Sequence, residues 1–370
     1  IVTGDWSSDV CSSDLSANSN QFNNMTNPND QLATALENDV RSLCLPEGRM
    51  VGTPGHATAE AWVARRLTEI GCQPYRGDSF ALPYHVNGQD FTNFAGIIPG
   101  ANRDLAPVLI GAHYDSVIEA PCADDNGAAV AITLAVGEAV ASSGGLARDL
   151  LVVIFDAEEP PYYLGRAMGS NRFYEDQLDD RGVHFALISD LVGHDVDLPL
   201  DFAGDLPAGI DIAGALRPLT FATGAESHPD LPGLLTGIAI PERMKLIATL
   251  NEYVGDMSDH GVFRRNGVPY LFLSCGHWEH YHQPTDTPDR LNYRKMAAIK
   301  EYAEGVCRAA ASSELTEFPE AVDPIAFEAS TWNTALGPLT TPLASFLGVE
   351  NFETRENVGT AAHTLQQFGL

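Results

Sequence analysis

Short apolar runs alternate along the chain with longer stretches in which apolar residues recur at helical spacing. The runs that predict buried strands cover 106–112, 150–155, 183–189 and 268–274. The helical stretches cover 58–71, 126–145 and 294–313, and a further helix starts within 168–177. Strands that alternate with helices form crossover units. The pattern therefore predicts an α/β fold with three αβα layers, a mostly parallel central sheet and helices on both of its faces.

The charge of the chain narrows the class of partner. It has 21 basic and 50 acidic residues, and its formal net charge is -29. Such a surface repels nucleic acid and anionic lipid, so neither is expected as a partner. The longest apolar stretch, 127–137, is too short to span a bilayer, and no membrane association is predicted. Apart from Cys11, the cysteines are odd in number and scattered, which is not the pattern of a disulfide-built fold.

Acidic residues and histidines follow the predicted strands directly. They are His113 and Asp115 after 106–112; Asp156, Glu158 and Glu159 after 150–155; Asp190 after 183–189; and His277, Glu279, His280 and His282 after 268–274. The loop CADDNG (122–127) adds Asp124 and Asp125 just before a predicted helix. In an open α/β sheet, ligands bind beyond the carboxyl ends of the strands. Five segments that are far apart in sequence are therefore predicted to converge at one edge of the sheet.

The combination of these side chains indicates a metal site. Carboxylates that gather in one place repel one another unless they share a cation. Two histidines with several carboxylates are typical ligands of zinc or a similar divalent ion. A set of this size can hold two ions about 3.5–4 Å apart, bridged by one carboxylate. The motifs GxSxG, HExxH and GxxxxGK[ST], which would indicate other chemistries, do not occur.

The order of the motifs resembles that of one known family. GAHYDSV, ADDNG, VVIFDAEEP, ALISDLVG, SDHGVF and YHQPTDTPD follow one another between residues 32 and 310. In this region the chain is similar to the zinc aminopeptidase and glutaminyl cyclase superfamily, the family-28 metallopeptidases. The run EEPPYYLGRAMGS resembles a bacterial branch of that family. The resemblance implies a zinc-exopeptidase-like αβα fold and Zn²⁺ as the cofactor, with two ions per chain.

The resemblance also implies a ligand set. His113 and Asp190 would bind one ion, and Glu159 and His282 would bind the other. Asp125 would bridge the two ions.

Other carboxylates would act without binding a metal. Glu158 would be the general acid–base, taking a proton from a water that the two metals hold and passing it to the leaving amine. Asp115 would hydrogen-bond His113 and fix the orientation of its ring. Asp259 in SDH would support the site similarly, whereas Asp156 is interpreted as structural.

For two of the ligand positions, a nearby residue of the same type is an alternative ligand. Asp124 competes with Asp125 for the bridging position, and His280 competes with His282 as the last ligand. His282 is preferred because HQPTDTPD fits the closing motif of the family.

The predicted function is metal-dependent release of N-terminal amino acids, so the substrate would be the N-terminus of a peptide or protein. A glutaminyl-peptide cyclotransferase with a single zinc is the alternative. Tyr281 stands before His282, where such a cyclase is expected to carry Trp, which favours the peptidase. A catalytically inactive receptor-like relative is a third possibility, against which every expected ligand and Glu158 are present. The oligomeric state and the preferred substrate residue are not indicated by the sequence.

Four regions are predicted along the chain. Residues 1–15 contain the near-duplicates WSSDV and CSSDL and resemble a translated sequencing adapter. Residues 16–30 are predicted to be a flexible leader, 31–313 the metallopeptidase domain and 314–370 a C-terminal extension without an assigned role. The segment 195–244 is expected to shape the substrate pocket. Because the native N-terminus is expected to be missing, secretion or a periplasmic location is retained only as a hypothesis.

Overall fold

The computed structural model describes residues 27–197, 212–316, 318 and 320–367. The adapter-like segment 1–15 and most of the leader 16–30 lie outside the described residues. The helix α1 (Pro28–Leu43) begins within the predicted leader, because the side chain of Asn27 accepts a hydrogen bond from the amide of Asn29 at 3.1 Å and proline follows the cap. The helix α2 (Pro54–Glu69) begins earlier than predicted, capped in the same way by Thr53.

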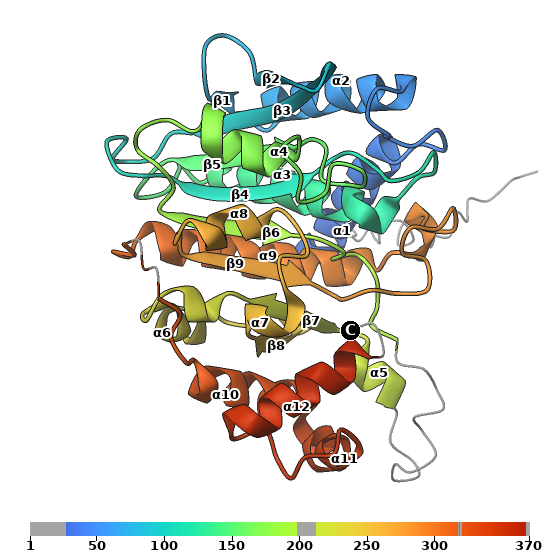
Figure 1. The fold of residues 1–370 in the computed structure, drawn as a ribbon, viewed down its shortest axis with the longest axis vertical. Helices are drawn as coiled ribbons and strands as arrows, with labels where there is room; N and C mark the ends of the chain where they lie inside the picture. The colour runs from blue at the N-terminus through green and yellow to red at the C-terminus, as the bar shows by residue number, and fades with distance from the viewer. Residues whose placement is uncertain (1–26, 198–211, 317, 319, 368–370) are drawn as a thin grey trace, which may run out of the picture.

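A mixed sheet of nine described strands forms the middle layer (Figure 1). The strands are β1 (Gln73–Pro74), β2 (Ala81–Val86), β3 (Gln89–Ile98), β4 (Val108–His113), β5 (Leu150–Phe155), β6 (Phe185–Ser189), β7 (Leu219–Thr223), β8 (Lys245–Thr249) and β9 (Tyr270–Ser274). Their order is β1-β3-β5-β4-β6-β9-β7-β8, and β2 pairs with β3. The centre, β5-β4-β6-β9, is parallel as predicted, whereas β3 and β7 join it antiparallel on either side.

Helices cover both faces of this sheet. The helices and helical turns of the main body are η1 (Ala123–Gly127), α3 (Ala128–Ser142), α4 (Gly169–Arg172), η2 (Phe173–Gln177), α5 (Ile212–Leu216), η4 (Ala225–Ser227), α6 (Leu231–Thr236), α7 (Asn251–Val254), α8 (His260–Arg265), η5 (Pro288–Arg290) and α9 (Tyr293–Ala311). α1, α3 and α9 lie behind the sheet in Figure 1, and α4 and α8 lie in front of it. The predicted three-layer α/β class is confirmed.

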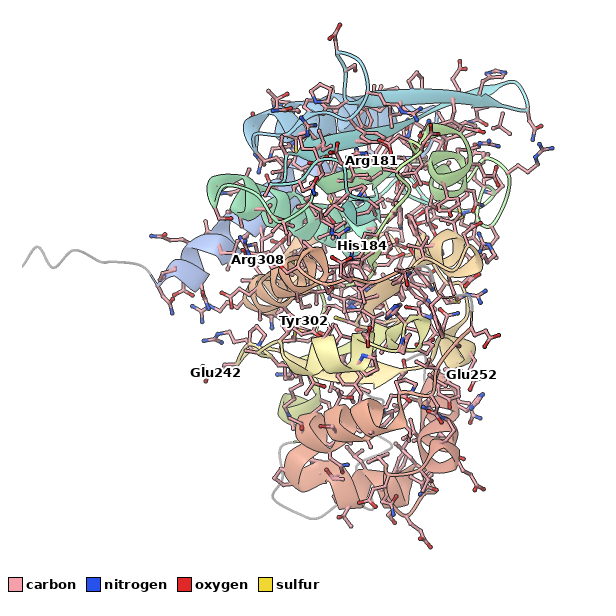
Figure 2. All side chains as sticks on the ribbon, turned by 90° about the vertical axis from the view of Figure 1, so that its left-hand side faces the viewer. Arg181, His184, Glu242, Glu252, Tyr302 and Arg308 are labelled. Atoms are coloured by element: carbon pink, nitrogen blue, oxygen red, sulfur yellow. The ribbon has the colours of Figure 1, made fainter. Side chains whose placement is uncertain are left out.

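Successive side chains of the central strands point to opposite faces of the sheet and so pack into two separate cores. In β5, Val152 and Ile154 pack into the core beneath α3 and α9, while Leu151 and Val153 pack into the core beneath α8. Tyr302 of α9 is buried in the first core, whereas Glu242 and Glu252 project into solvent on opposite sides of the molecule (Figure 2). Within the described residues, no helix combines the length and the apolar character needed to cross a membrane.

The C-terminal extension, which the sequence left without a role, continues the fold beyond β8. It contains α10 (Ile325–Leu336), η6 (Gly337–Leu339), α11 (Thr340–Phe346) and α12 (Arg355–Gln366). α10 covers the outer edge of β8: the amide of Ala248 donates to Thr331 Oγ1 at 2.9 Å, and Trp332 Nε1 donates to the carbonyl of Ala248 at 3.1 Å. Side chains of α10 thus satisfy backbone groups that an exposed edge strand would leave unpaired.

Candidate metal centre

The carboxyl ends of three adjacent parallel strands bring the first candidate ligands together. His113 is the last residue of β4 and pairs in register with Phe155 at the end of β5. Glu158 and Glu159 follow β5, and Asp190 directly follows β6 on the other side of β4. Loops that leave neighbouring parallel strands emerge at one edge, so these side chains meet there.

The first cluster consists of His113, Asp125 and Asp190, whose potential ligand atoms all lie within 4.8 Å of one another. His113 Nε2 lies 3.5 Å from Asp125 Oδ1 and 3.5 Å from Asp190 Oδ2. All three side chains are buried. Asp190 is also held by the hydroxyl of Ser258, which donates to Asp190 Oδ2 at 2.7 Å.

The second cluster consists of Asp125, Glu159 and His282 and meets the same 4.8 Å limit. His282 Nε2 lies 3.2 Å from Asp125 Oδ2 and 3.2 Å from Glu159 Oε2. Asp125 therefore turns one oxygen toward His113 and the other toward His282. This is the arrangement that a carboxylate shared between two ions would require.

Several buried atoms in the two clusters lack hydrogen-bond partners among the described residues. They are Nε2 of His113 and of His282, Oδ2 of Asp125, Oε1 of Glu159 and Oδ1 of Asp190. Leaving buried polar atoms unpaired costs about 1–3 kcal/mol each, so such atoms in a native site call for another partner. The donor set of imidazole nitrogens and carboxylate oxygens, without thiolates, fits zinc or a similar divalent ion.

The raised pKa values of two carboxyl groups in the loop after β5 also indicate a metal site. Burial, and then the charge of Asp125, raise the pKa of Glu159 to about 8. Burial also raises the pKa of Glu158 well above its usual range, an effect that the nearby His113 opposes. The site thus holds more carboxylates than its histidines neutralise, and cations bound between them would relieve the excess.

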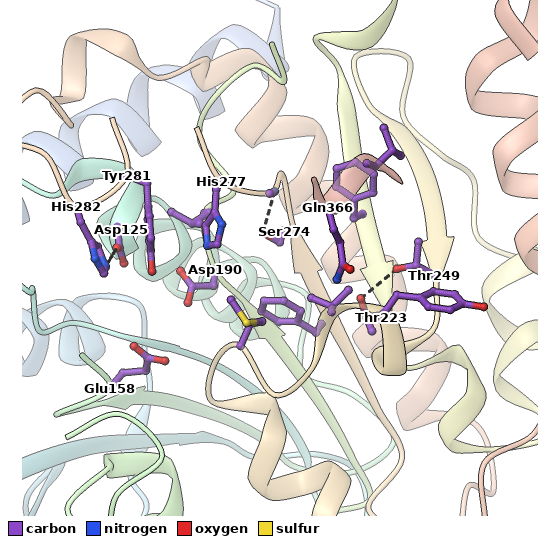
Figure 3. A pocket seen from close by; sticks show the side chains of 18 of the residues that line it. Asp125, Glu158, Asp190, Thr223, Thr249, Ser274, His277, Tyr281, His282 and Gln366 are labelled. Carbon is purple, nitrogen blue, oxygen red and sulfur yellow. Dashed lines mark hydrogen bonds and ion pairs between the residues drawn. The ribbon is translucent and has the colours of Figure 1, made fainter. Parts of the chain in front are cut away.

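Glu158 faces the cavity rather than either cluster. Its Oε2 lies 3.8 Å from His113 Nε2, and the residue is 5% exposed and belongs to neither ligand group. Figure 3 shows its carboxylate below Asp190 and Asp125, directed toward the same space. From this position Glu158 can reach a substrate group that approaches the clusters.

Asp115 accepts hydrogen bonds from the amides of the two glutamates and lies beside the histidine. The amide of Glu158 donates to Asp115 Oδ1 at 3.0 Å, and the amide of Glu159 donates to Asp115 Oδ2 at 3.1 Å. His113 Nδ1 lies 3.2 Å from Asp115 Oδ1. The sequence suggested only the contact with His113, because backbone donors cannot be inferred from residue types.

The two aspartates of CADDNG point in different directions. Asp124 Oδ1 accepts from the amide of Gly193 at 2.5 Å, and Asp124 Oδ2 lies 2.5 Å from His194 Nδ1. Its carboxylate is therefore engaged away from both clusters, which leaves Asp125 as the residue between them. The sequence missed Asp286, whose carboxylate accepts from the amides of Asp124 and Asp125 at 2.9–3.1 Å. Its place in QPTDTPD, a predicted ligand loop, was the available signal.

The remaining candidates lie outside the clusters. His280 Nδ1 lies 3.0 Å from Thr285 Oγ1, and His280 belongs to no ligand group among the described residues. Asp259 is fully buried at the start of α8, and burial raises its pKa to about 7. Asp156 accepts from the amides of Thr92 and Ala157, at 2.8 Å each. It is thus used in loop structure, as interpreted from the sequence.

Three residues beside or within the clusters hold a left-handed backbone. Ala157, Leu191 and His282 have φ values of 53°, 53° and 57°. Non-glycine residues rarely adopt this region, and such strain is concentrated at functional sites. Ala157 precedes Glu158 and Leu191 follows Asp190, so the strain occurs where the backbone aims these carboxylates.

A cavity of about 490 Å³ opens beside the two clusters. Asp125, Glu158, Glu159, Asp190 and His282 line one end of it. Figure 3 shows Asp125, Glu158, Asp190 and His282 at this end. The other walls are mainly apolar and come from β7, β9, α7, α12 and neighbouring loops. Their apolar residues are Leu191, Phe221, Tyr253, Val254, Met257, Phe272, Ala362 and Leu365. The segment 195–244 contributes Phe221 and Thr223, while 198–211 lies outside the described residues. A volume of this size suits a small molecule or an amino-acid side chain.

A protein of Escherichia coli has a sequence similar to that of this chain. The chain is 26% identical to YfbL of Escherichia coli (strain K12), a protein described as uncharacterized, over 255 residues that cover 58% of this chain and 72% of YfbL.

Solved structures share the fold at lower identity. The Legionella pneumophila aminopeptidase LapA superposes with a TM-score of 0.60 at 16% identity, covering 77% of this chain and 74% of LapA. A glutaminyl cyclase of Bacteroides thetaiotaomicron bound to N-acetylhistamine has a TM-score of 0.55 at 14% identity, covering 75% of this chain and 97% of the cyclase. The model of peptidase family M28 matches residues 93–306, more than half of the chain, and this span includes all five candidate ligands and Glu158. The chain belongs to peptidase family M28.

Proposed function

We propose that this protein is an aminopeptidase that binds two zinc ions, one at each cluster, and releases N-terminal amino acids from peptides. Membership of the family supports a metallopeptidase-like hydrolase. The observation that carries the finer proposal is the position of Asp125, whose two oxygens face His113 and His282 separately. A carboxylate that bridges two ions would use its two oxygens in this way.

The residues around the clusters have distinct tasks in the proposed reaction. Divalent ions at the clusters would supply electrophilic stabilisation of the scissile carbonyl and lower the pKa of water. Glu158 accepts a proton at its carboxylate and delivers it to the leaving amine, a role that suits a buried carboxyl whose pKa is raised. Asp115 keeps Glu158 and Glu159 in place through their amides.

Two further observations favour a peptidase over a cyclase. The resemblance associates cyclases with a single zinc and with Trp before the last ligand. This chain has Tyr281 at that position and has two clusters that share Asp125. The cavity is also mainly apolar beyond the clusters, which suits the side chain of an apolar N-terminal residue. A substrate of this kind would place its first peptide bond at the charged end.

A panel of aminoacyl 4-nitroanilides tests the proposal, alongside an N-terminally acetylated leucyl substrate and a glutaminyl peptide. The expected result is release of nitroaniline from free-amine substrates, no release from the acetylated one, and no cyclisation of the glutaminyl peptide. A chelator is expected to abolish the activity, and added zinc or cobalt is expected to restore it. Cyclisation without hydrolysis, or full activity in the chelator, would contradict the proposal.

A further inference from the structure

The C-terminal helix α12 forms part of the cavity wall, although it lies outside the family-matched span. Ala362, Leu365 and Gln366 line the cavity together with residues of β7 and α7. The matched span ends at residue 306, so α12 lies beyond the part of the chain that the family model covers. We infer that α12 is the specificity wall of the enzyme and limits the size of the N-terminal side chain that the cavity accepts. The inference rests on the proposed aminopeptidase function.

The cavity has two chemically different ends. Figure 3 shows His282, Asp125 and Glu158 on one side and Gln366, Thr223 and Thr249 on the other. The hydroxyls of Thr223 and Thr249 lie 3.4 Å apart and close the floor between β7 and β8. The far end therefore carries no charge among its described lining residues. It can select a side chain by shape, apolar contact and hydrogen bonds to neutral groups such as Gln366, but not by charge.

The position of α12 relative to the cavity is held by several contacts with α7 and α10. The side chain of Thr354 caps the helix by accepting from the amide of Asn357 at 3.2 Å. Arg355 pairs with the buried Glu328 of α10, and its Nη1 donates to Tyr253 Oη at 3.3 Å. Tyr253 itself lines the cavity, so the contact joins α12 to a second wall residue.

Close packing reinforces this attachment. The ring of His363 lies edge-on to the ring of Tyr253, with centroids 5.1 Å apart. At Gly359 an added Cβ would lie only 2.9 Å from Tyr253 Oη, so the helix backbone approaches the tyrosine closely. Because α12 is fixed at its first and middle turns, the side chains of its last turn present a defined surface to the cavity.

Ala362 and Leu365 are the positions at which the depth of the cavity can be changed. Ala362 is 6% exposed and small, so a larger side chain there would occupy space now open to a substrate. Leu365 is 9% exposed, and its truncation would lengthen the cavity. Thr360 lies on the exposed face of the same helix and provides a control for added bulk.

The test compares A362L, L365A and the control T360L by kcat/KM for alanyl, leucyl and phenylalanyl 4-nitroanilides, in zinc-loaded full-length protein. For A362L, we expect the ratio of phenylalanyl to alanyl kcat/KM to fall roughly tenfold or more, the scale of a lost apolar contact in a pocket. For L365A the ratio is expected to shift toward the larger substrate, and for T360L it should stay within about twofold of wild type. An unchanged ratio in both cavity variants would overturn the inference.

Binding of the free amino acids separates this inference from the proposed reaction. If the wild type hydrolyses none of the substrates, the aminopeptidase proposal fails, and calorimetric titration with L-alanine and L-phenylalanine decides the role of α12. Weaker binding of phenylalanine by A362L, with alanine binding unchanged, supports the specificity wall. Equal affinities in wild type and A362L, or no binding of either amino acid to the wild type, overturn it.

Discussion

The two ends of the cavity are built by different means. At the charged end, the ligands come from three strand ends and two loops, and all but the half-buried His282 are buried. They are fixed by hydrogen bonds that Asp115 and Asp286 accept from backbone amides and that Ser258 donates to Asp190. At the far end, Phe221, Tyr253 and α12 present apolar or neutral surface, and α12 is held by contacts of Arg355, a residue that does not line the cavity. The first end lies wholly within the family-matched span, whereas α12 lies outside it.

In this account the charged end of the cavity carries out the reaction, and the far end selects the substrate. A reaction needs particular atoms within a few tenths of an ångström of their working positions, so its supporting hydrogen bonds must be kept together with the ligands. Selection by an apolar wall needs mainly the right shape, and an element outside the family-matched span, such as α12, can supply it. Substitutions at the charged end should therefore abolish turnover, and those at the far end should redistribute it among substrates.

The largest effect is expected from E158Q at the charged end. The amide cannot accept the proton, so kcat should fall by on the order of 10²–10⁴-fold, the usual contribution of a general base. Zinc content, measured by mass spectrometry of the metal, should remain at the wild-type value because Glu158 is not in either cluster.

Two matched variants sharpen this prediction. E159Q should lose zinc together with activity, since Glu159 belongs to the second cluster. E119Q changes an exposed glutamate and should leave both quantities unchanged. Loss of zinc in E158Q with retention in E159Q would mean that the roles of the two glutamates are reversed.

D115N should have a smaller effect of the same kind. Asp115 accepts from two amides and approaches His113, and an amide in its place offers only one acceptor oxygen. Changes at groups that orient ligands typically cost about 10–100-fold in metal affinity or activity. Zinc titration and kcat/KM would measure the loss, with D104N at an exposed position as the control. Wild-type values for both would show that Asp115 does not orient the site.

The smallest effect on catalysis is expected from T331V in α10, the helix that covers β8. This substitution should lower the stability of the fold and leave the metal site unchanged. T331V keeps the shape of the side chain but leaves the amide of Ala248 without its acceptor, at a cost of about 1–3 kcal/mol in the free energy of unfolding. Denaturant titration measures this loss, and zinc content should not change. T334V, at an exposed threonine of the same helix, should alter stability by less than about 0.5 kcal/mol. A large loss of zinc in T331V would show that the two ends are not separable.

The sequence predicted the parallel centre from the alternation of strands with helices. It predicted the convergence of the candidate ligands from the charged residues that follow those strands. It did not predict the hairpin of β2 and β3, although Asn87 and Gly88, with φ values of 53° and 84°, form the Asn-Gly turn that often joins two strands. The wall formed by α12 could not be foreseen, because its short apolar face is weakly patterned. Its position depends on tertiary contacts such as that between Arg355 and Tyr253.

The central claim is that two ions share Asp125, and anomalous diffraction at the zinc edge from zinc-loaded crystals tests it most directly. The account predicts two peaks per chain, one among His113, Asp125 and Asp190 and the other among Asp125, Glu159 and His282. Their separation should be about 3.5–4 Å. A single peak at full zinc loading, or peaks that Asp125 does not contact, would contradict it.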